Sequence, residues 1–214
     1  IIYFCNKVAE RINGDPEVND RLRVVFVQNY NCSYAERIIP AADLSQQISP
    51  AGTEASGTGN MKLMLNGAIT LGTLDGANIE IAQQAGQENE YIFGATAQEI
   101  DAIRETYNPN DIYRASPRIR RAVDALVDGS ICEPDAGLTE LHDALLKGAS
   151  WHRPDHHFLL LDFAAYQAAR LRAYMEYKDE PRAFARKCLL NIAGAGPFSA
   201  DRAVRQYAEN IWRV

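Results

Sequence analysis

Residues 53–80 read TEASGTGNMKLMLNGAITLGTLDGANIE, and this stretch decides how the rest of the chain is interpreted. Glu54, an acid expected to be buried, precedes the turn Gly57-Thr58-Gly59. The apolar run that begins after Asn60 predicts a short helix carrying Lys62. Glycine lets the backbone point its amide groups at a ligand, and a helix start adds unpaired N–H groups. The pattern therefore favours an anion such as phosphate at this turn.

Two common phosphate motifs do not fit this turn. A P-loop needs two glycines five apart followed at once by lysine, but Thr58 follows the pair Gly52 and Gly57. The dinucleotide-binding fingerprint needs a third glycine where Lys62 stands. The sequence therefore predicts neither kind of nucleotide site.

Lys62 has two interpretations that its spacing leaves open. A lysine in apolar surroundings can lose its proton near neutral pH and form a Schiff base with an aldehyde. The cofactor that combines an aldehyde with a phosphate is pyridoxal phosphate. In the other interpretation, the aliphatic part of Lys62 lies along the helix and its charge stays in water, which is the commoner case for lysine.

The segment from Glu54 to Lys62, continued by residues 65–68 and 72–78, closely resembles the pyridoxal-phosphate signature of the glycogen (α-glucan) phosphorylases. Residues 20–27, 39–44, 92–94 and 198–202 also resemble segments of that family, in the family's order. The resemblance implies an enzyme that transfers the terminal glucosyl unit of an α-1,4-glucan to inorganic phosphate and releases glucose 1-phosphate.

The resemblance also implies a role for each residue that matches the family's motif. Lys62 matches the lysine that binds pyridoxal phosphate covalently, and Thr58 matches a residue that touches the cofactor's phosphate. Tyr30 matches an aromatic residue beside the pyridine ring. The residues that match groups holding the glucosyl unit are Glu54, Ala55, Ser56 and Gly57. The catalytic set implied is thus Lys62, Glu54 and Thr58.

The order of predicted elements indicates an α/β fold. Strands are expected at 22–27, 46–49, 68–73 and 91–93, and helices at 1–12, 33–39 and 78–84, with Ser33 as the cap of the second helix. This alternation predicts a short parallel sheet. Beyond Thr96 the pattern is helical, with helices expected at 96–107, 117–127, 138–146, 163–177, 181–192 and 199–212. Thr96 and Glu99 have the spacing of a capping box at the first of these helix starts.

The resemblance implies that this fold is part of a Rossmann-like domain of the two-Rossmann glycosyltransferase type. We expect residues 1–95 to form its α/β part with the cofactor lysine, and residues 96–214 to form a helical C-terminal part of the same catalytic domain. The chain starts without methionine inside a helical pattern, which predicts a C-terminal fragment of a longer protein. Such a fragment would lack its N-terminal domain, would be inactive alone, and could pair with a second copy.

Composition and charge narrow the classes of partner. The chain is 47% hydrophobic and 23% charged, as is ordinary for a soluble globular protein, and its net charge of −6 disfavours nucleic acid or an anionic membrane as partner. The cysteines, at positions 5, 32, 132 and 188, are scattered without a CxxC pair, which favours reduced thiols and a cytoplasmic protein. The group His152, Asp155, His156 and His157 is interrupted by Pro154, so we expect a partly solvated loop there and no metal site.

Two other functions remain open from the sequence. A sugar-nucleotide-dependent glycosyltransferase of the same two-domain architecture would need no cofactor on Lys62. A non-catalytic glucan-binding module would keep affinity for the glucan without turnover.

Overall fold

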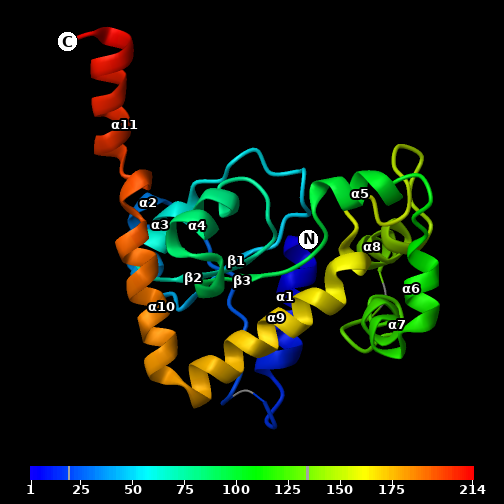
Figure 1. Ribbon diagram of the computed structural model, residues 1–214. Coiled ribbons are helices and arrows are strands. Elements are labelled where there is room, and N and C mark those ends of the chain that lie inside the picture. The colour runs from blue at the N-terminus through cyan, green and yellow to red at the C-terminus, as the bar shows by residue number, and fades with distance from the viewer. Residues whose placement is uncertain (19, 134) are drawn as a thin grey trace. The chain divides into compact units, whose positions relative to one another are not determined.

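Figure 1 shows the computed structural model of the chain, which describes residues 1–18, 20–133 and 135–214. These residues form two compact units. Unit 1 comprises residues 1–31 and 106–160, and unit 2 comprises residues 32–105 and 161–214. The candidate site lies in unit 2. The predicted division of the chain at residue 95 stays a prediction.

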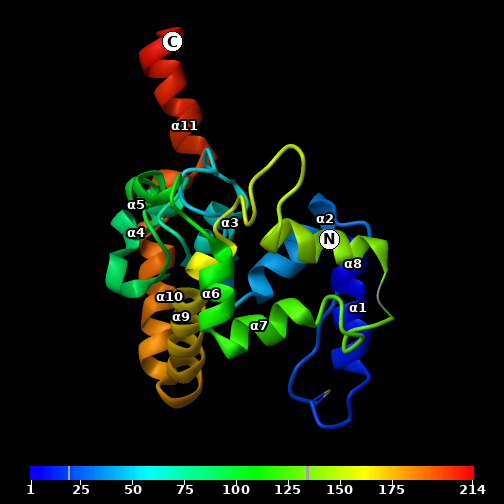
Figure 2. The same ribbon diagram turned by 90° about the vertical axis from the view of Figure 1, so that its right-hand side faces the viewer.

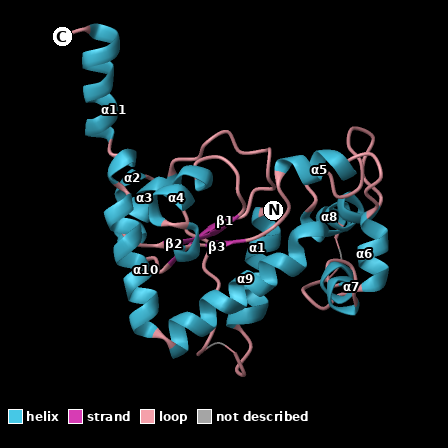
Figure 3. Ribbon diagram, viewed as in Figure 1, coloured by secondary structure: helices cyan, strands magenta, loops and turns pink. Residues whose placement is uncertain are grey.

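Unit 2 is built on a parallel sheet of three short strands in the order β1-β2-β3, as Figure 3 shows in magenta. The strands are β1 (Leu44–Gln47), β2 (Ile69–Gly72) and β3 (Tyr91–Ile92). Leu44 pairs with Ile69 in the first ladder, and Leu71 pairs with Tyr91 in the second. All four residues of the central strand β2 are buried, as is typical of a parallel strand with neighbours on both edges. The α/β fold with a short parallel sheet is therefore confirmed.

Helices form much of the rest of unit 2. In unit 2 they are α2 (Cys32–Ile38), α3 (Gly59–Leu65), α4 (Asn78–Ala85), α5 (Ala97–Ile103), most of α9 (Leu159–Asp179), α10 (Pro181–Gly194) and α11 (Ala200–Tyr207). Short helical turns are η1 (Ile39–Ala41), η2 (Gln87–Asn89), η3 (Gly196–Phe198) and η4 (Ala208–Trp212). Figure 2 shows α9 passing into α10, and the sharp turn between these helices is made by Glu180.

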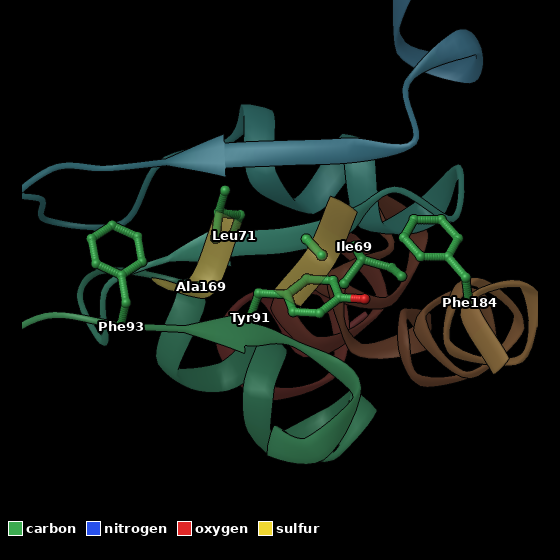
Figure 4. Packing of buried hydrophobic residues seen from close by; sticks show 7 residues of the cluster. Ile69, Leu71, Tyr91, Phe93, Ala169 and Phe184 are labelled. Atoms are coloured by element: carbon green, nitrogen blue, oxygen red, sulfur yellow. The ribbon is translucent and has the colours of Figure 1, made fainter. Parts of the chain in front are cut away.

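The hydrophobic core of unit 2 joins the sheet to α9 and α10 (Figure 4). Ile69 and Leu71 alternate with Thr70 along β2 and therefore face the same side of the sheet. The other members of the cluster are Tyr91, Phe93, Ala169, Ala173 and Phe184. A second cluster unites Met64 of α3 with Ile81 and Ala85 of α4. Helix α10 packs against α3, α4, β2 and η2, so it touches most of the elements that frame the site.

Unit 1 is helical in the part that the structure describes. Its helices are α1 (Ile2–Asn13), α6 (Pro109–Ala115), α7 (Pro117–Asp124) and α8 (Ala136–Leu146). The first residues of α9 also belong to unit 1, and Asp155 binds their backbone. Its carboxylate accepts hydrogen bonds from the N–H groups of Leu159 and Leu160 at 2.9 and 2.8 Å. The Tyr107 hydroxyl donates to the same carboxylate at 2.7 Å. This buried acid therefore satisfies the unpaired N–H groups that every helix start leaves.

The strand predicted at residues 22–27 is wrong. The segment is irregular, and Leu22, Val25 and Phe26 are exposed. A strand needs a neighbouring strand for its backbone groups, and the described residues of unit 1 supply none. The segment is tied down instead by Asn13, whose side chain accepts from the backbone N–H of Val24 at 3.0 Å and donates to its carbonyl at 2.8 Å.

Three helix starts show what local patterns can and cannot fix. The capping box at Thr96 is confirmed, because its hydroxyl accepts from the backbone of Glu99 while the Glu99 carboxylate accepts from the backbone of Thr96. Ser33 is not the cap of α2, which begins one residue earlier at Cys32. Helix α6 was not predicted, although its Asn108 cap and its proline at the first position are ordinary start signals.

Candidate functional site

The candidate site lies where β1 and β2 end. The two strands are parallel, so their carboxyl ends lie at the same edge of the sheet, which is where open α/β sheets bind ligands. The loop of residues 48–58 follows β1 and leads into α3, and the turn of residues 73–77 follows β2 and leads into α4. We call these two segments, together with the first turns of α3 and α4 into which they lead, the lysine corner. It brings Glu54, Ala55, Ser56, Gly57, Thr58 and Lys62 into one region of unit 2.

Asp75 fixes the loop that carries Glu54. Its buried carboxylate accepts hydrogen bonds from the backbone N–H groups of Thr53, at 3.0 Å, and Glu54, at 2.7 Å. An ionised acceptor makes hydrogen bonds stronger than those between neutral groups. In addition, the Thr73 hydroxyl donates to the carbonyl of Ser49 at 2.6 Å. The turn after β2 therefore holds the loop after β1 by its backbone.

Glu54 was expected to be buried, and this expectation is wrong. Its side chain is exposed, and the buried acid of the stretch is Asp75. Since its backbone is held by Asp75, Glu54 presents its carboxylate to solvent from a fixed position. The sequence did contain a signal for Asp75, because the aspartate of an Asp-Gly turn often binds backbone N–H groups.

A second tie joins the starts of α3 and α4. The Asn60 side chain donates to Asn78 Oδ1 at 3.0 Å and accepts from the backbone of Met61 at 2.9 Å. Asn78 in turn donates to the carbonyl of Thr73 at 3.1 Å. Both asparagines are buried, so these bonds are shielded from water. They position the first turn of α3, on which Lys62 stands.

Two glycines are required by the geometry of the corner. Gly76 has φ = +50°, and a Cβ atom there would lie 2.6 Å from the carbonyl oxygen of Ser56. Gly57 has φ = +81° and lies against the side chain of Asn60. A Cβ atom on Gly59, in contrast, would meet nothing within 4 Å, so this side of the turn is open.

Lys62 is exposed on α3, in agreement with the second of its two interpretations. The apolar surroundings expected in the first interpretation are not formed by the described residues. Within residues 1–18, 20–133 and 135–214, its amine makes neither an ion pair nor a hydrogen bond. Three of the other four lysines are paired with carboxylates: Lys7 with Glu10, Lys147 with Asp143 and Lys187 with Glu176. Lys62 therefore offers a free amine beside the open side of the turn.

Thr58 and Ser56 carry the hydroxyl groups of the turn. Thr58 is the N-cap residue of α3, but its side chain makes no capping hydrogen bond, so its hydroxyl is available to a ligand. Ser56 is exposed and donates to the neighbouring carbonyl of Gly57 at 3.0 Å. Both side chains thus stand on a backbone that buried groups hold in place.

Tyr30 belongs to unit 1 and is 62% exposed, whereas the lysine corner belongs to unit 2. Its role beside a cofactor stays a prediction, as do the roles assigned to the residues of the corner itself. In the described part of the chain, no group of three or more His, Cys, Asp or Glu side chains is placed to hold a metal ion. Within the same residues, no helix has both the length and the apolar character that crossing a membrane requires.

Comparison with known proteins gives a consistent result over the whole chain. The family model described as carbohydrate phosphorylase matches residues 1–214. The brain form of glycogen phosphorylase from Bos taurus is 46% identical over 215 residues, which cover 99% of this chain and 25% of that protein. Glycogen phosphorylases from Synechocystis sp. and Chlamydia trachomatis are 44% and 45% identical over 100% of this chain. The chain spans about a quarter of the length of these relatives, 25% and 26% of the last two.

Proposed function

Because the chain belongs to the carbohydrate phosphorylase family, we propose that its lysine corner binds pyridoxal phosphate within an α-glucan phosphorylase. In this proposal the enzyme transfers the terminal glucosyl unit of an α-1,4-glucan to inorganic phosphate and releases glucose 1-phosphate. The relatives named above support the choice of glucan, since each is a glycogen phosphorylase. The observation that carries the proposal is the free amine of Lys62 beside the open side of a glycine turn.

The residues of the corner fit the cofactor. Pyridoxal phosphate needs a primary amine for its aldehyde and hydrogen-bond donors for its phosphate. Lys62 supplies an unpaired amine, and Thr58 supplies a hydroxyl that no cap uses. The open side at Gly59 leaves the backbone of the turn accessible to an anion. When bound, the cofactor would supply a phosphate group whose second pKa of about 6 suits proton exchange near neutral pH.

Each residue of the corner then has a defined task. Lys62 anchors the cofactor through its amine, and Thr58 orients the phosphate group. Glu54, Ala55, Ser56 and Gly57 hold hydroxyl groups of the glucosyl unit. A carboxylate near a sugar that develops positive charge also stabilises the transition state, and the side chain of Glu54 would reach the sugar from a backbone that Asp75 holds.

The proposal also covers the partners of the enzyme and its location in the cell. Its partners would be the glucan, inorganic phosphate, an N-terminal domain of the same protein and a possible second copy, while nucleic acid and membranes are not expected. A cytoplasmic location is supported by the four cysteines, all of which are free, since free thiols are usual in a reducing compartment.

Reductive labelling tests the proposal without depending on activity. The protein is incubated with pyridoxal phosphate, the lysine–aldehyde linkage is fixed with borohydride, and the modified peptide is mapped. We expect the label on Lys62, and loss of the label in Lys62→Ala. Lys178→Ala is the matched control, because Lys178 is also exposed and unpaired within the described residues but lies far along the chain at the end of α9.

Two results would contradict the proposal. Labelling of Lys178 or of a paired lysine in place of Lys62 would remove Lys62 from the cofactor site. Absence of any label, together with transfer from a sugar nucleotide, would support the glycosyltransferase alternative. Calorimetric titration with a maltooligosaccharide separates the remaining alternative, since a glucan-binding module would retain affinity without the cofactor.

A further inference from the structure

Three buried oxygen atoms of unit 2 lack a hydrogen-bond partner among the described residues. They are Thr70 Oγ1 on β2, Glu90 Oε1 just before β3, and Asn191 Oδ1 on α10. Thr70 and Asn191 are 0% exposed and Glu90 is 5% exposed. A buried polar atom without a partner is costly, so a cluster of such atoms requires an explanation.

The hydrogen bonds that these residues do make leave the three oxygens free. Glu90 Oε2 accepts from the backbone N–H of Thr70 at 2.6 Å, which fixes the carboxyl group against β2. The amide nitrogen of Asn191 donates to the carbonyl of Lys187 at 3.1 Å, so its oxygen is the atom left without a partner. The side chains of Asn191 and Thr70 both lie against Glu90. If Glu90 is ionised, the Thr70 hydroxyl is the only hydrogen of these three side chains that Asn191 Oδ1 can accept, because the second amide N–H of Asn191 cannot reach its own oxygen.

We propose that Glu90 binds a proton in the folded protein, and that this proton is the missing donor that fastens α10 to the sheet through Asn191. The protonated carboxyl group is a donor, whereas the carboxylate only accepts. The neutral acid thus supplies a second hydrogen to the cluster and removes a buried charge. Loss of the proton leaves a buried anion that can no longer donate to Asn191, and this weakens the docking of α10.

The electrostatic surroundings favour the protonated form. Burial raises the pKa of Glu90 from 4.5 to about 7, against the opposing effects of the Thr70 backbone, the Asn191 and Thr70 side chains and the Lys187 charge. Lys187 cannot compensate fully, because its amine already bonds to Glu176 at 2.7 Å. The other charged or titratable groups around Glu90 are Glu88 on η2, Tyr91 on β3, Arg172 on α9 and Cys188 on α10. Glu90 also lines a pocket of about 360 Å³, which gives water and protons a route to this region.

The sign of the pH dependence follows from the pKa. The unfolded chain releases the proton near pH 4.5, whereas the folded protein holds it until about pH 7. This contribution to stability is therefore complete below pH 4.5 and is lost as the pH rises toward 7. The unfolding equilibrium constant should rise by a factor on the order of 100 over that window.

A direct titration tests the proton site in the wild-type protein. The carboxyl carbon of Glu90 is followed by carbon-13 NMR from pH 4 to 9 and assigned by its absence in Glu90→Gln. We expect a midpoint near 7. A midpoint near the ordinary value of 4.5 would overturn the proposal.

A comparison of variants tests the link to α10. In Glu90→Gln the side chain keeps its shape, carries no titrating proton and offers an amide donor. We expect the loss of stability between pH 5 and 7.5 to disappear, together with the faster hydrogen exchange of α10 after correction for the intrinsic pH effect. Glu88→Gln is the matched control, because Glu88 is exposed and lines the same pocket, and it should behave like the wild type. Equal pH profiles for Glu90→Gln and the wild type, in stability and in exchange, would also overturn the proposal.

Discussion

The lysine corner and the Glu90 cluster are both buried polar networks in unit 2, but they are completed to different degrees. In the corner, Asp75, Asn60 and Asn78 find partners at 2.7 to 3.1 Å. In the Glu90 cluster, three oxygens have no partner among the described residues. A fully paired network fixes one geometry, which suits the cofactor site that we propose for the corner. A network that lacks one donor responds to the proton concentration.

The largest change in stability is expected when the fully paired network of the corner is broken. Asp75→Ala removes the acceptor of two backbone N–H groups and should lower the free energy of unfolding by about 2–4 kcal/mol, measured by urea denaturation. Asp101→Ala is the control. Asp101 is exposed and, among the described residues, makes only a surface pair with Arg104, so its loss should change stability by less than about 0.5 kcal/mol. Equal effects of the two variants would show that Asp75 does not hold the loop.

The next largest effect is expected in the catalytic efficiency of a Glu54 variant, with little change in its stability. In the phosphorylase that we propose, Glu54→Gln should lower kcat/KM by roughly 10- to 150-fold, because a hydrogen bond to a charged group contributes about 1.5–3 kcal/mol. Its stability should stay close to that of the wild type, because the side chain is exposed. An unchanged kcat/KM for glucan phosphorolysis would remove Glu54 from the site. Glu80→Gln, at an exposed position on α4, is the control.

A backbone test of the corner should give a slightly smaller effect. Gly76→Ala places a Cβ atom 2.6 Å from the Ser56 carbonyl at a positive φ, so we expect a loss of about 1–3 kcal/mol in unfolding free energy. Gly59→Ala should not destabilise the protein, since the added atom meets nothing within 4 Å. The same loss in both variants would contradict the geometry described for Gly76.

The smallest effect is expected in the incomplete network. Lys187→Met removes a cation whose charge lowers the pKa of Glu90, so the NMR midpoint of Glu90 should move to higher pH. The substitution also breaks the ion pair with Glu176, in which both side chains are mostly buried. This loss should lower the free energy of unfolding by about 1 kcal/mol. Lys178→Met is the control and should leave the midpoint unchanged. A midpoint that moves to lower pH would contradict the charge arrangement around Glu90.

Much of unit 2 could be predicted from the sequence because its signals are local. The strand around Ile69, the helices that carry Lys62 and Asn78, and the capping box at Thr96 all depend on neighbours within a few residues. Likewise, the resemblance of residues 54–78 to the phosphorylase family agrees with the family match over residues 1–214.

Features that depend on distant residues were not predictable in the same way. The strand expected at residues 22–27 has the right composition, but composition does not provide a partner strand. Asp75 is the buried acid because its side chain binds the backbone of Glu54. The two residues lie 21 positions apart, so neighbouring residues do not reveal this contact. The Glu90 cluster joins residues on β2, before β3 and on α10, so no window of the sequence contains it.

The packing of α10 gives the two networks a common element. Helix α10 touches β2, where the Glu90 carboxyl group is fixed, and it also touches α3, which carries Lys62. Coupling between two sites through a shared element is reciprocal. A ligand at Lys62 that binds better when α10 is docked must therefore strengthen the hold of Glu90 on its proton. Such a ligand would bind with net proton uptake near neutral pH, and its measured binding enthalpy would depend on the ionisation enthalpy of the buffer.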